Sequence, residues 1–276
     1  MSRSPLLVGL WRILFYAFRP SVPFVMQTER YRLWANPARK AQGGDNTRAV
    51  IRRGRWEAFA TDRLERHIKP GCTFVDAGAN FGHYAMTVAS LAGAEGQVWA
   101  FEPEPAAFEL LKTNIALNSL ANVRAECAGL SDTNGELTFT VDDANVGGHS
   151  FVAAATERPG RQVQTRVYAL DAYLAEFAPS RRLDALKIDV QGYEQAVISG
   201  AMKTLARDMP VVLCEIWPEG MRAAGTDHLK LVQTFFDLGY AAEALIAGQV
   251  IPFGPTEFDA ILGDGGYMDA LFYRRI

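Results

Sequence analysis

Residues 74–82, FVDAGANFG, have the residue types and spacing of a ligand-binding turn. Asp76 ends an apolar run, and Gly78 and Gly82 flank the passage into a helical pattern. Glycine permits a tight turn and a close approach of the backbone to a ligand. Twenty residues after Gly82 the next apolar run ends at Glu102, whose carboxylate can accept hydrogen bonds from both hydroxyls of a ribose. Together these features predict a site for an adenosine-containing cofactor.

The charge of this turn distinguishes two such cofactors. A pyrophosphate, as in NAD, requires backbone amides at a helix N-terminus without a neighbouring negative charge. Here Asn80 stands where the dinucleotide-binding pattern has its second glycine, and Asp76 would repel a pyrophosphate. A carboxylate suits the ammonium and sulfonium of S-adenosylmethionine, which is therefore the expected cofactor. In the alternative interpretation Asp76 only caps the following helix.

Three further carboxylates are candidates for acid/base chemistry: Asp189, Glu194 and Glu215. An alcohol is a poor nucleophile until it loses its proton, so a methyl acceptor needs a base nearby. Asp189 is the expected base because it lies at the end of the buried apolar strand expected at 185–190, where burial should raise its pKa if no cation compensates. Glu215 ends another apolar run, where it could share this work or serve a structural role.

Four other side chains are candidates for contacts with the acceptor substrate. His83 begins a helix, where the dipole disfavours protonation, so it could accept a proton or pack beside the cofactor. His149 and Ser150 belong to a glycine-rich loop that could close over the acceptor or be an ordinary surface loop. Trp217 could offer an aromatic face to a sugar ring or belong to the core.

The elements that must position these residues alternate between short apolar strands and helical patterns. We expect the principal strands at 73–76, 97–101, 123–127, 185–190 and 210–217. Further strands are expected at 136–141 and 164–168, with short strands and hairpins over 241–253 and 258–274. We expect helices at 56–68, 82–91, 105–118, 170–177, 194–205 and 229–238. Such alternation predicts a mostly parallel sheet covered on both faces, with ligands at the carboxyl ends of its strands.

The segments FVDAGANFGHYA, VWAFEPEPAAFELLKTNIALN and LKIDVQGYEQAVISG together resemble the FkbM-type methyltransferase family, over roughly residues 54–217. The resemblance implies a class I methyltransferase fold, which is Rossmann-like. In this three-layer sandwich a mostly parallel seven-stranded sheet has an antiparallel final strand. It also implies transfer of a methyl group from S-adenosylmethionine to an oxygen, often of sugars, glycolipids or polyketide natural products.

The resemblance assigns roles to particular residues of this chain. Those implied to bind the cofactor are Asp76, Gly78, Asn80, Gly82, Glu102, Pro103, Ala128 and Ser131, the last two near the adenine. Asp189 and Glu194 would face the methyl-transfer centre. The family usually has a glutamate where this chain has Gln191, which weakens the case for a divalent cation and favours Gln191 as a hydrogen-bonding residue that orients the substrate. No metal site is therefore expected.

Composition limits the other classes of function. With 276 residues, of which 49% are hydrophobic and 21% charged, the chain can form one globular domain, expected at 55–276. A net charge of −3 argues against nucleic-acid binding. The arginines in 48–55 could hold an anionic acceptor or form a solvated face. Cys72, Cys127 and Cys214 lack the spacing of a zinc site or a disulfide framework, so we expect buried thiols in a cytoplasmic protein.

An N-terminal helical extension is expected over residues 1–54. Residues 6–18 are largely apolar but too few to span a bilayer, so they should pack on the domain or lie on a membrane surface. The expected partner is a small-molecule or glycan acceptor, and the oligomeric state stays open. Two alternative functions stay open as well, an NAD(P)-dependent oxidoreductase and a non-catalytic module that binds S-adenosylmethionine.

Overall fold

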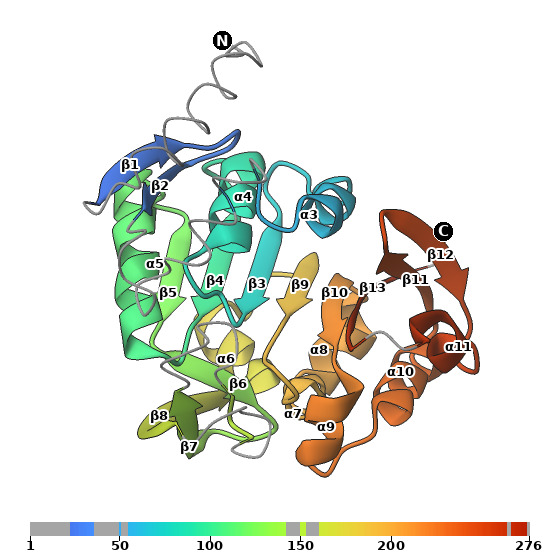
Figure 1. Ribbon diagram of the computed structural model, residues 1–276. Coiled ribbons are helices and arrows are strands. Elements are labelled where there is room, and N and C mark those ends of the chain that lie inside the picture. Colours follow the sequence, from blue (N-terminus) through green and yellow to red (C-terminus); the bar gives the residue numbers. More distant parts are fainter. Residues whose placement is uncertain are drawn as a thin grey trace, which may run out of the picture.

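A computed structural model gives the structure of the chain and describes residues 23–35, 50, 55–141, 150–152, 160–263 and 266–274. An eight-stranded sheet forms its centre, in the order β12-β11-β13-β10-β9-β3-β4-β5 (Figure 1). The strands are β3 (Thr73–Ala77), β4 (Gln97–Phe101), β5 (Val123–Glu126), β9 (Ala185–Ile188), β10 (Val211–Ile216), β11 (Tyr240–Ile246), β12 (Gln249–Phe253) and β13 (Met268–Arg274).

Strand directions match the expected mostly parallel sheet. The strands β5, β4, β3, β9 and β10 run parallel, and β13 lies antiparallel between β10 and β11. The antiparallel final strand is therefore confirmed. The structure adds an eighth strand, β12, which pairs antiparallel with β11 at the sheet edge.

Helices cover both faces of the sheet because each central strand is apolar on both sides. One face carries α3 (Ala58–Glu65), α4 (His83–Ala92) and α5 (Pro105–Leu117). The other carries α6 (Leu170–Phe177), α7 (Glu194–Ser199), α8 (Met202–Asp208) and α10 (His228–Asp237). Side chains alternate between the faces: Phe74 packs under α3–α5, while its neighbour Val75 packs under the other helices. The result is the three-layer arrangement that the sequence predicts.

The helix expected at 194–205 is two helices, α7 and α8. A Cβ at Gly200, which separates them, would lie 2.0 Å from the carbonyl oxygen of Ser131. The chain therefore needs glycine where it passes this backbone. Two further short helices, α9 (Pro218–Ala223) and α11 (Phe258–Leu262), follow β10 and β12.

A small three-stranded sheet lies beside α6 and α7, below the large sheet in Figure 1. Its order is β6-β8-β7, with β6 (Ala128–Ser131) parallel to β8 (Arg161–Ala169) and β7 (Gly135–Val141) antiparallel to it. The strands expected at 136–141 and 164–168 are thus present. Residues 128–131, expected only to lie near the adenine, form a strand as well.

A β-hairpin occupies part of the N-terminal extension, made of β1 (Phe24–Gln27) and β2 (Arg32–Ala35). The expectation of helix over 1–54 is therefore wrong for these residues. Their side chains alternate in burial, and backbone N–H groups of β2 donate to the side chains of Asn114 and Asn118 on α5, at 2.9 and 2.7 Å. Period-two burial against one helix suits strands rather than a helix.

The expectations for the N-terminal segment, the arginines and the cysteines have different outcomes. Residues 6–18 and the arginines at 48, 52 and 53 lie outside the described residues. Within the described part, no helix has the length and apolar character that crossing a membrane requires. Cys72 and Cys214 are buried free thiols as expected, whereas Cys127, which follows β5, is exposed.

Candidate active site

The face of the sheet beneath α3 and α4 becomes polar at the carboxyl ends of its strands. Pairing places Asp76 on β3 opposite Lys187 on β9, and Glu215 on β10 opposite Asp269 on β13. Each lies two positions from a residue that packs under α3–α5, so all four side chains point to the same face. With Glu57 and Asp189, these residues form what we call the carboxylate cluster: Glu57, Asp76, Asp189, Glu215 and Asp269 around Lys187.

Lys187 is the cation at the centre of this cluster, and its side chain is only 7% exposed. Its Nζ donates hydrogen bonds to Oδ2 of Asp189 and to the carbonyl oxygen of Gly78, each at 3.1 Å. Nζ also lies 3.9 Å from Oδ1 of Asp76. Burial alone would lower the pKa of Lys187, but the charges of Asp189, Asp76 and Glu57 outweigh burial and raise it. The lysine is therefore charged at physiological pH.

Asp189 is held by two donors and keeps a quarter of its side chain exposed. Oδ2 accepts from Lys187, and Oδ1 accepts from Nε2 of Gln191 at 2.8 Å. Burial would raise its pKa, but the charge of Lys187 and the hydrogen bonds lower it below the ordinary value. The pKa increase expected from burial alone is thus offset, because a cation does compensate. Asp189 is an ionised carboxylate with access to solvent.

Gln191 connects Asp189 to Glu215. Its Nε2 donates a second hydrogen bond to Oε2 of Glu215, also at 2.8 Å. Burial, followed by the charges of Asp189 and Asp269, raises the pKa of Glu215 well above its ordinary value. The structure thus brings together Asp189, Gln191 and Glu215, all three predicted from the sequence. Asp189 is ionised, whereas Glu215 favours its protonated form.

Three residues of this site were missed by the sequence analysis. Lys187 could have been noticed as a charge within an otherwise apolar run. Glu57 accepts a hydrogen bond from the hydroxyl of Tyr84 at 2.9 Å, and burial raises the pKa of Asp269 to about 7. Nothing local in the sequence marks Glu57 or Asp269, because their proximity to Asp189 depends on strand pairing and helix packing.

Glu194 is fully buried, which contradicts its assignment to the methyl-transfer centre. Its Oε1 accepts from the backbone N–H of Gly192 at 2.9 Å, while Oε2 has no hydrogen-bond partner among the described residues. Burial raises the pKa of Glu194 to about 7. The carboxyl group begins α7 and supports the preceding turn through this hydrogen bond, with no exposed surface of its own.

Ser150 is also buried, and its hydroxyl is used within the protein. Oγ donates to the carbonyl oxygen of Gln191 at 2.7 Å and accepts from the N–H of Val152 at 2.9 Å. Both observations argue against the predicted contact between Ser150 and substrate. His149, predicted with it, lies outside the described residues.

The predicted cofactor turn joins β3 to α4 with left-handed backbone at Gly78 (φ +79°), Asn80 (φ +50°) and Gly82 (φ +93°). A Cβ at Gly78 would lie 1.9 Å from the carbonyl oxygen of Asp189, so only glycine fits there. This contact places the turn directly against the residue that follows β9. The cofactor turn and the expected base are therefore neighbours.

Glu102 directly follows β4 and closes the other side of this turn. Its oxygens accept from the backbone N–H groups of Asn80 at 2.7 Å and Glu104 at 2.8 Å. Burial raises the pKa of Glu102 to about 7. Each oxygen retains a lone pair, since a carboxylate oxygen can accept two hydrogen bonds. A strand-terminal carboxylate beside a glycine turn fits the ribose of S-adenosylmethionine, and Pro103 is buried next to it.

Asp76 has the role of the alternative interpretation. It is fully buried, and Oδ2 accepts from the N–H of Ala85 at 3.0 Å, in the first turn of α4. Burial raises its pKa to about 6, against the effect of Lys187. Asp76 thus holds the first turn of α4, while its Oδ1 accepts no hydrogen bond from the described residues.

The residues predicted near the adenine are buried too. Ala128 and Ser131 lie on β6 with almost no exposed surface. The hydroxyl of Ser131 bonds to Asp132 at 3.0 Å and lies 3.1 Å from the hydroxyl of Tyr193. Both residues thus lie on a strand that pairs with β8, and Ala128 packs in the core.

His83 and Trp217 hold elements together. The ring nitrogens of His83 lie 2.7 Å from the hydroxyl of Tyr31 and 2.8 Å from that of Thr61, linking the hairpin and α3 to α4. Burial lowers the pKa of His83 to about 3, so the ring is neutral with both nitrogens occupied. Trp217 is half-buried against α9, where a Cβ at Gly220 would lie 2.1 Å from its ring. The geometry therefore argues against substrate contact for His83.

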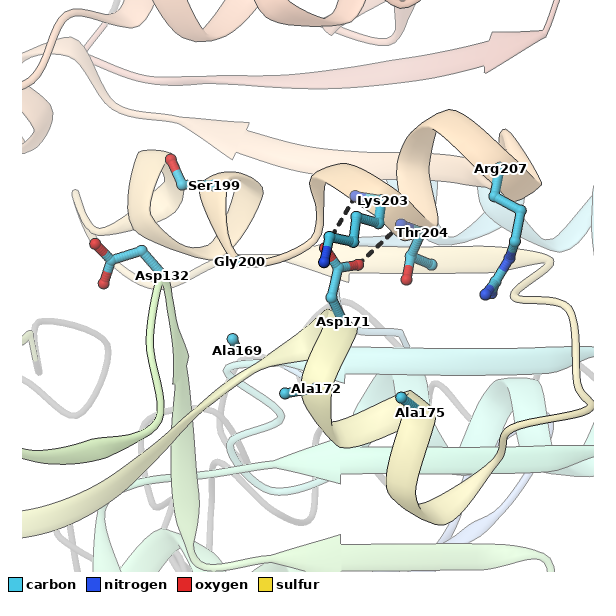
Figure 2. A pocket seen from close by; sticks show the side chains of 10 residues that line it. All are labelled: Asp132, Ala169, Asp171, Ala172, Ala175, Ser199, Gly200, Lys203, Thr204 and Arg207. Carbon is cyan, nitrogen blue, oxygen red and sulfur yellow. Dashed lines mark hydrogen bonds between the residues drawn. The ribbon is translucent and has the colours of Figure 1, made fainter.

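A separate cleft of about 510 Å³ lies between α6 and α8, on the opposite face of the sheet. In Figure 2 Asp171 accepts hydrogen bonds from the backbone of Lys203 and Thr204, at 2.9 and 2.8 Å, and so caps α8. The lining of the cleft also includes Asp132, Arg207 and several alanines. None of the described residues predicted for the site lines this cleft, so the chemistry belongs to the carboxylate cluster and the adjoining turn.

Comparison with known proteins gives matches to methyltransferases. The profile described as "Methyltransferase FkbM domain" matches residues 76–242. Methyltransferase sdnD from Sordaria araneosa is 31% identical over 54% of this chain and 68% of its own. The 31-O-demethyl-FK506 methyltransferase FkbM from Streptomyces tacrolimicus is 30% identical over 51% of this chain and 65% of its own. A crystal structure of methyltransferase FkbM from Methylobacillus flagellatus, 13% identical, matches with a TM-score of 0.47 over 84% of this chain and 61% of that one.

Proposed function

Because this chain belongs to the FkbM methyltransferase domain family and is thus a methyltransferase that depends on S-adenosylmethionine, we propose that it methylates a hydroxyl oxygen of a carbohydrate, glycolipid or natural product. One observation carries the proposal. Asp189, an ionised and partly exposed carboxylate, adjoins the cofactor turn through the backbone contact with Gly78. A base beside the methyl donor is the arrangement that O-methylation needs.

The cofactor supplies an electrophilic methyl group when it is bound. Glu102 and the turn at Gly78 and Asn80 would hold it, the carboxylate at the ribose and the turn at the methionine part. Alignment of the acceptor oxygen with the methyl group is the main demand of such a transfer, and good positioning is worth several kcal/mol.

Asp189 accepts the proton of the acceptor hydroxyl. Lys187 keeps Asp189 ionised and oriented through the 3.1 Å hydrogen bond. A carboxylate with a lowered pKa is a weak base, so it serves best by taking the proton late, as the new bond to oxygen forms. General-base assistance of this kind typically contributes about 10²- to 10⁴-fold to the rate.

The charge of the carboxylate cluster supports a neutral or positively charged acceptor. Five carboxylates surround the single lysine of the cluster, and Asp189, Glu215 and Asp269 each keep some exposure. A phosphate or carboxylate on the acceptor would be repelled by Asp189, the partly exposed carboxylate of the cluster whose lowered pKa keeps it ionised. An O-methyl acceptor is further supported by the relative from Streptomyces tacrolimicus, whose name specifies methylation at the 31-oxygen of FK506.

The first experiment is a calorimetric titration with S-adenosylhomocysteine, with NAD and NADP in parallel. Binding of S-adenosylhomocysteine alone supports the proposed donor, whereas binding of NAD or NADP favours the oxidoreductase. A panel of sugars, glycolipids and macrolides is then tested with radiolabelled donor, for wild type and Asp189→Asn. We expect Asp189→Asn to lose about 10²-fold or more in turnover while it still binds S-adenosylhomocysteine. Unchanged turnover would remove Asp189 as the base.

A further inference from the structure

The turn after β9 holds a residue other than glycine in a left-handed conformation. Gln191 has φ +52° and is followed by Gly192 with φ +94°. Residues with a Cβ rarely adopt this backbone, and such strain persists where the surrounding structure fixes it. Strained positions of this kind concentrate at active sites and ligand clamps.

Three separate contacts fix this turn. The buried hydroxyl of Ser150 donates to the carbonyl oxygen of Gln191 at 2.7 Å. The carboxyl group of Glu194 accepts from the N–H of Gly192 at 2.9 Å. A Cβ at Gly192 would lie 2.7 Å from the carbonyl carbon of Gly220, so α9 packs directly against the turn. The backbone of Gln191 is thus held by α7, α9 and residue 150.

The side chain of Gln191 then has one orientation and two partners. Its amide nitrogen carries two N–H groups, and Nε2 lies 2.8 Å from both Oδ1 of Asp189 and Oε2 of Glu215. An ionised carboxylate can only accept hydrogen bonds, so Asp189 needs donors around it, and Gln191 supplies one while it also bonds to Glu215. A glutamate at this position would instead add a third acceptor.

We propose that Gln191 is a positioning residue that fixes Asp189 and Glu215 relative to each other and, together with Lys187, keeps Asp189 ionised. The proposal rests on the proposed function in one respect, the role of Asp189 as the base. Through this amide the turn holds Oδ1 of Asp189, while Lys187 holds Oδ2, and the two contacts together set the direction of the carboxylate.

The surroundings of the two carboxylates explain why the charge resides on Asp189. Asp189 has Lys187 at 3.1 Å, whereas Glu215 lies opposite another carboxyl group, Asp269. The other titratable groups near Asp189 are Glu57 before α3, Asp76 on β3, Glu194 on α7 and Tyr267 before β13. The pKa shifts of the two groups agree with these surroundings. Lys187 and Gln191 lower the pKa of Asp189 against the effect of burial, whereas burial and the charge of Asp189 raise the pKa of Glu215.

The test needs no acceptor. Side-chain carboxyl carbons of the full chain, labelled with carbon-13 at Asp and Glu, are titrated by NMR between pH 3 and 8. Wild type is compared with Gln191→Met, which keeps the length of the side chain but removes the amide. The control is Gln233→Met on α10, where an exposed Gln233 donates to Asp237 at 2.7 Å.

We expect the titration midpoint of Asp189 to shift upward in Gln191→Met and to stay in place in Gln233→Met. An unmoved midpoint in Gln191→Met would overturn the proposal. If that variant does not fold, the wild type still decides: slow exchange of both side-chain amide protons of Gln191 with solvent supports the two hydrogen bonds, and fast exchange contradicts them.

Titration with S-adenosylhomocysteine separates this proposal from the proposed function. A shifted midpoint without binding would sustain the role of Gln191 and overturn the methyltransferase site. Binding of S-adenosylhomocysteine with an unmoved midpoint of Asp189 in Gln191→Met would sustain the proposed function and overturn the role of Gln191.

Discussion

Asp76 and Lys187 lie directly opposite each other on the neighbouring parallel strands β3 and β9, with Nζ of the lysine 3.9 Å from Oδ1 of the aspartate. Both side chains are almost completely buried. Asp76 also holds the start of α4, and Lys187 also holds Asp189. The cofactor turn and the expected base therefore share one buried cation.

Replacement of this cation tests its role. Lys187→Met should lower the free energy of unfolding by about 3 kcal/mol at pH 8, because it leaves buried carboxylates unpaired. The loss should shrink at pH 5.5, since carboxyl groups with raised pKa values take up protons as the pH falls. Urea unfolding at both pH values measures it. Lys112→Met, which removes an exposed i,i+3 pair with Glu109, should cost less than about 1 kcal/mol. Equal losses at the two pH values for Lys187→Met would contradict the expected pairing.

Cofactor binding should depend on Glu102. Glu102→Gln should weaken binding of S-adenosylhomocysteine about 10- to 100-fold, the range for loss of a charged hydrogen-bond acceptor. Calorimetry gives the affinity, and the thermal midpoint of the unliganded variant shows whether the domain is intact. Glu109→Gln, on the exposed side of α5, is the matched control. Should both variants bind as tightly as wild type, Glu102 does not hold the ribose.

Glu194 should affect stability rather than catalysis. Its pKa of about 7 when folded lies above the ordinary value of 4.5, so its ionised form is disfavoured in the folded chain. Stability linked to Glu194 is complete below pH 4.5 and is lost as the pH rises through 7. Glu194→Gln removes this loss, so its stability relative to wild type should rise by about 3 kcal/mol between pH 4 and 8. Methyl transfer should persist in Glu194→Gln, and its abolition in a folded variant would return Glu194 to the catalytic residues.

The stability linked to His83 has the opposite pH dependence, because it is lost as the pH falls. Its pKa is about 3 in the folded chain and near 6.5 when unfolded, so unfolding takes up a proton between these values. The stability it provides is complete above pH 6.5 and falls by about 1.4 kcal/mol per pH unit below it. His83→Gln should therefore be about 2 kcal/mol less stable at pH 7.5, with a gap that narrows by pH 5. In NMR the ring of wild-type His83 should not titrate between pH 5 and 8, and a midpoint near 6.5 would refute the assignment.

The sequence predicted the central strands closely because their apolar runs leave little choice. The expected strand at 97–101 matches β4, and the helix at 170–177 matches α6. The hairpin was missed because its burial pattern is set by α5, about 80 residues later. Likewise β6 was missed because it pairs with β8 from a distant part of the chain.

For the site, the sequence identified the positions better than the roles. Asp189, Gln191 and Glu215 do lie together, since each follows or ends a strand at the same sheet edge. Burial decides the remaining roles, and burial depends on packing: it makes Asp76 a helix cap, and it encloses Glu194 below the turn. Asp269 could not be found at all, because it reaches Glu215 only through the pairing of β10 with β13.

The position of β13 also affects how the protein is made. This strand lies between β10 and β11, yet it is synthesised after both. A chain emerging from the ribosome must therefore keep the edges of β10 and β11 apart until residues 268–274 arrive. Unpaired apolar strand edges are templates for association with other chains. Slow translation or truncation just before residue 268 should consequently favour aggregation, because it leaves Glu215 on β10 without the strand that carries Asp269.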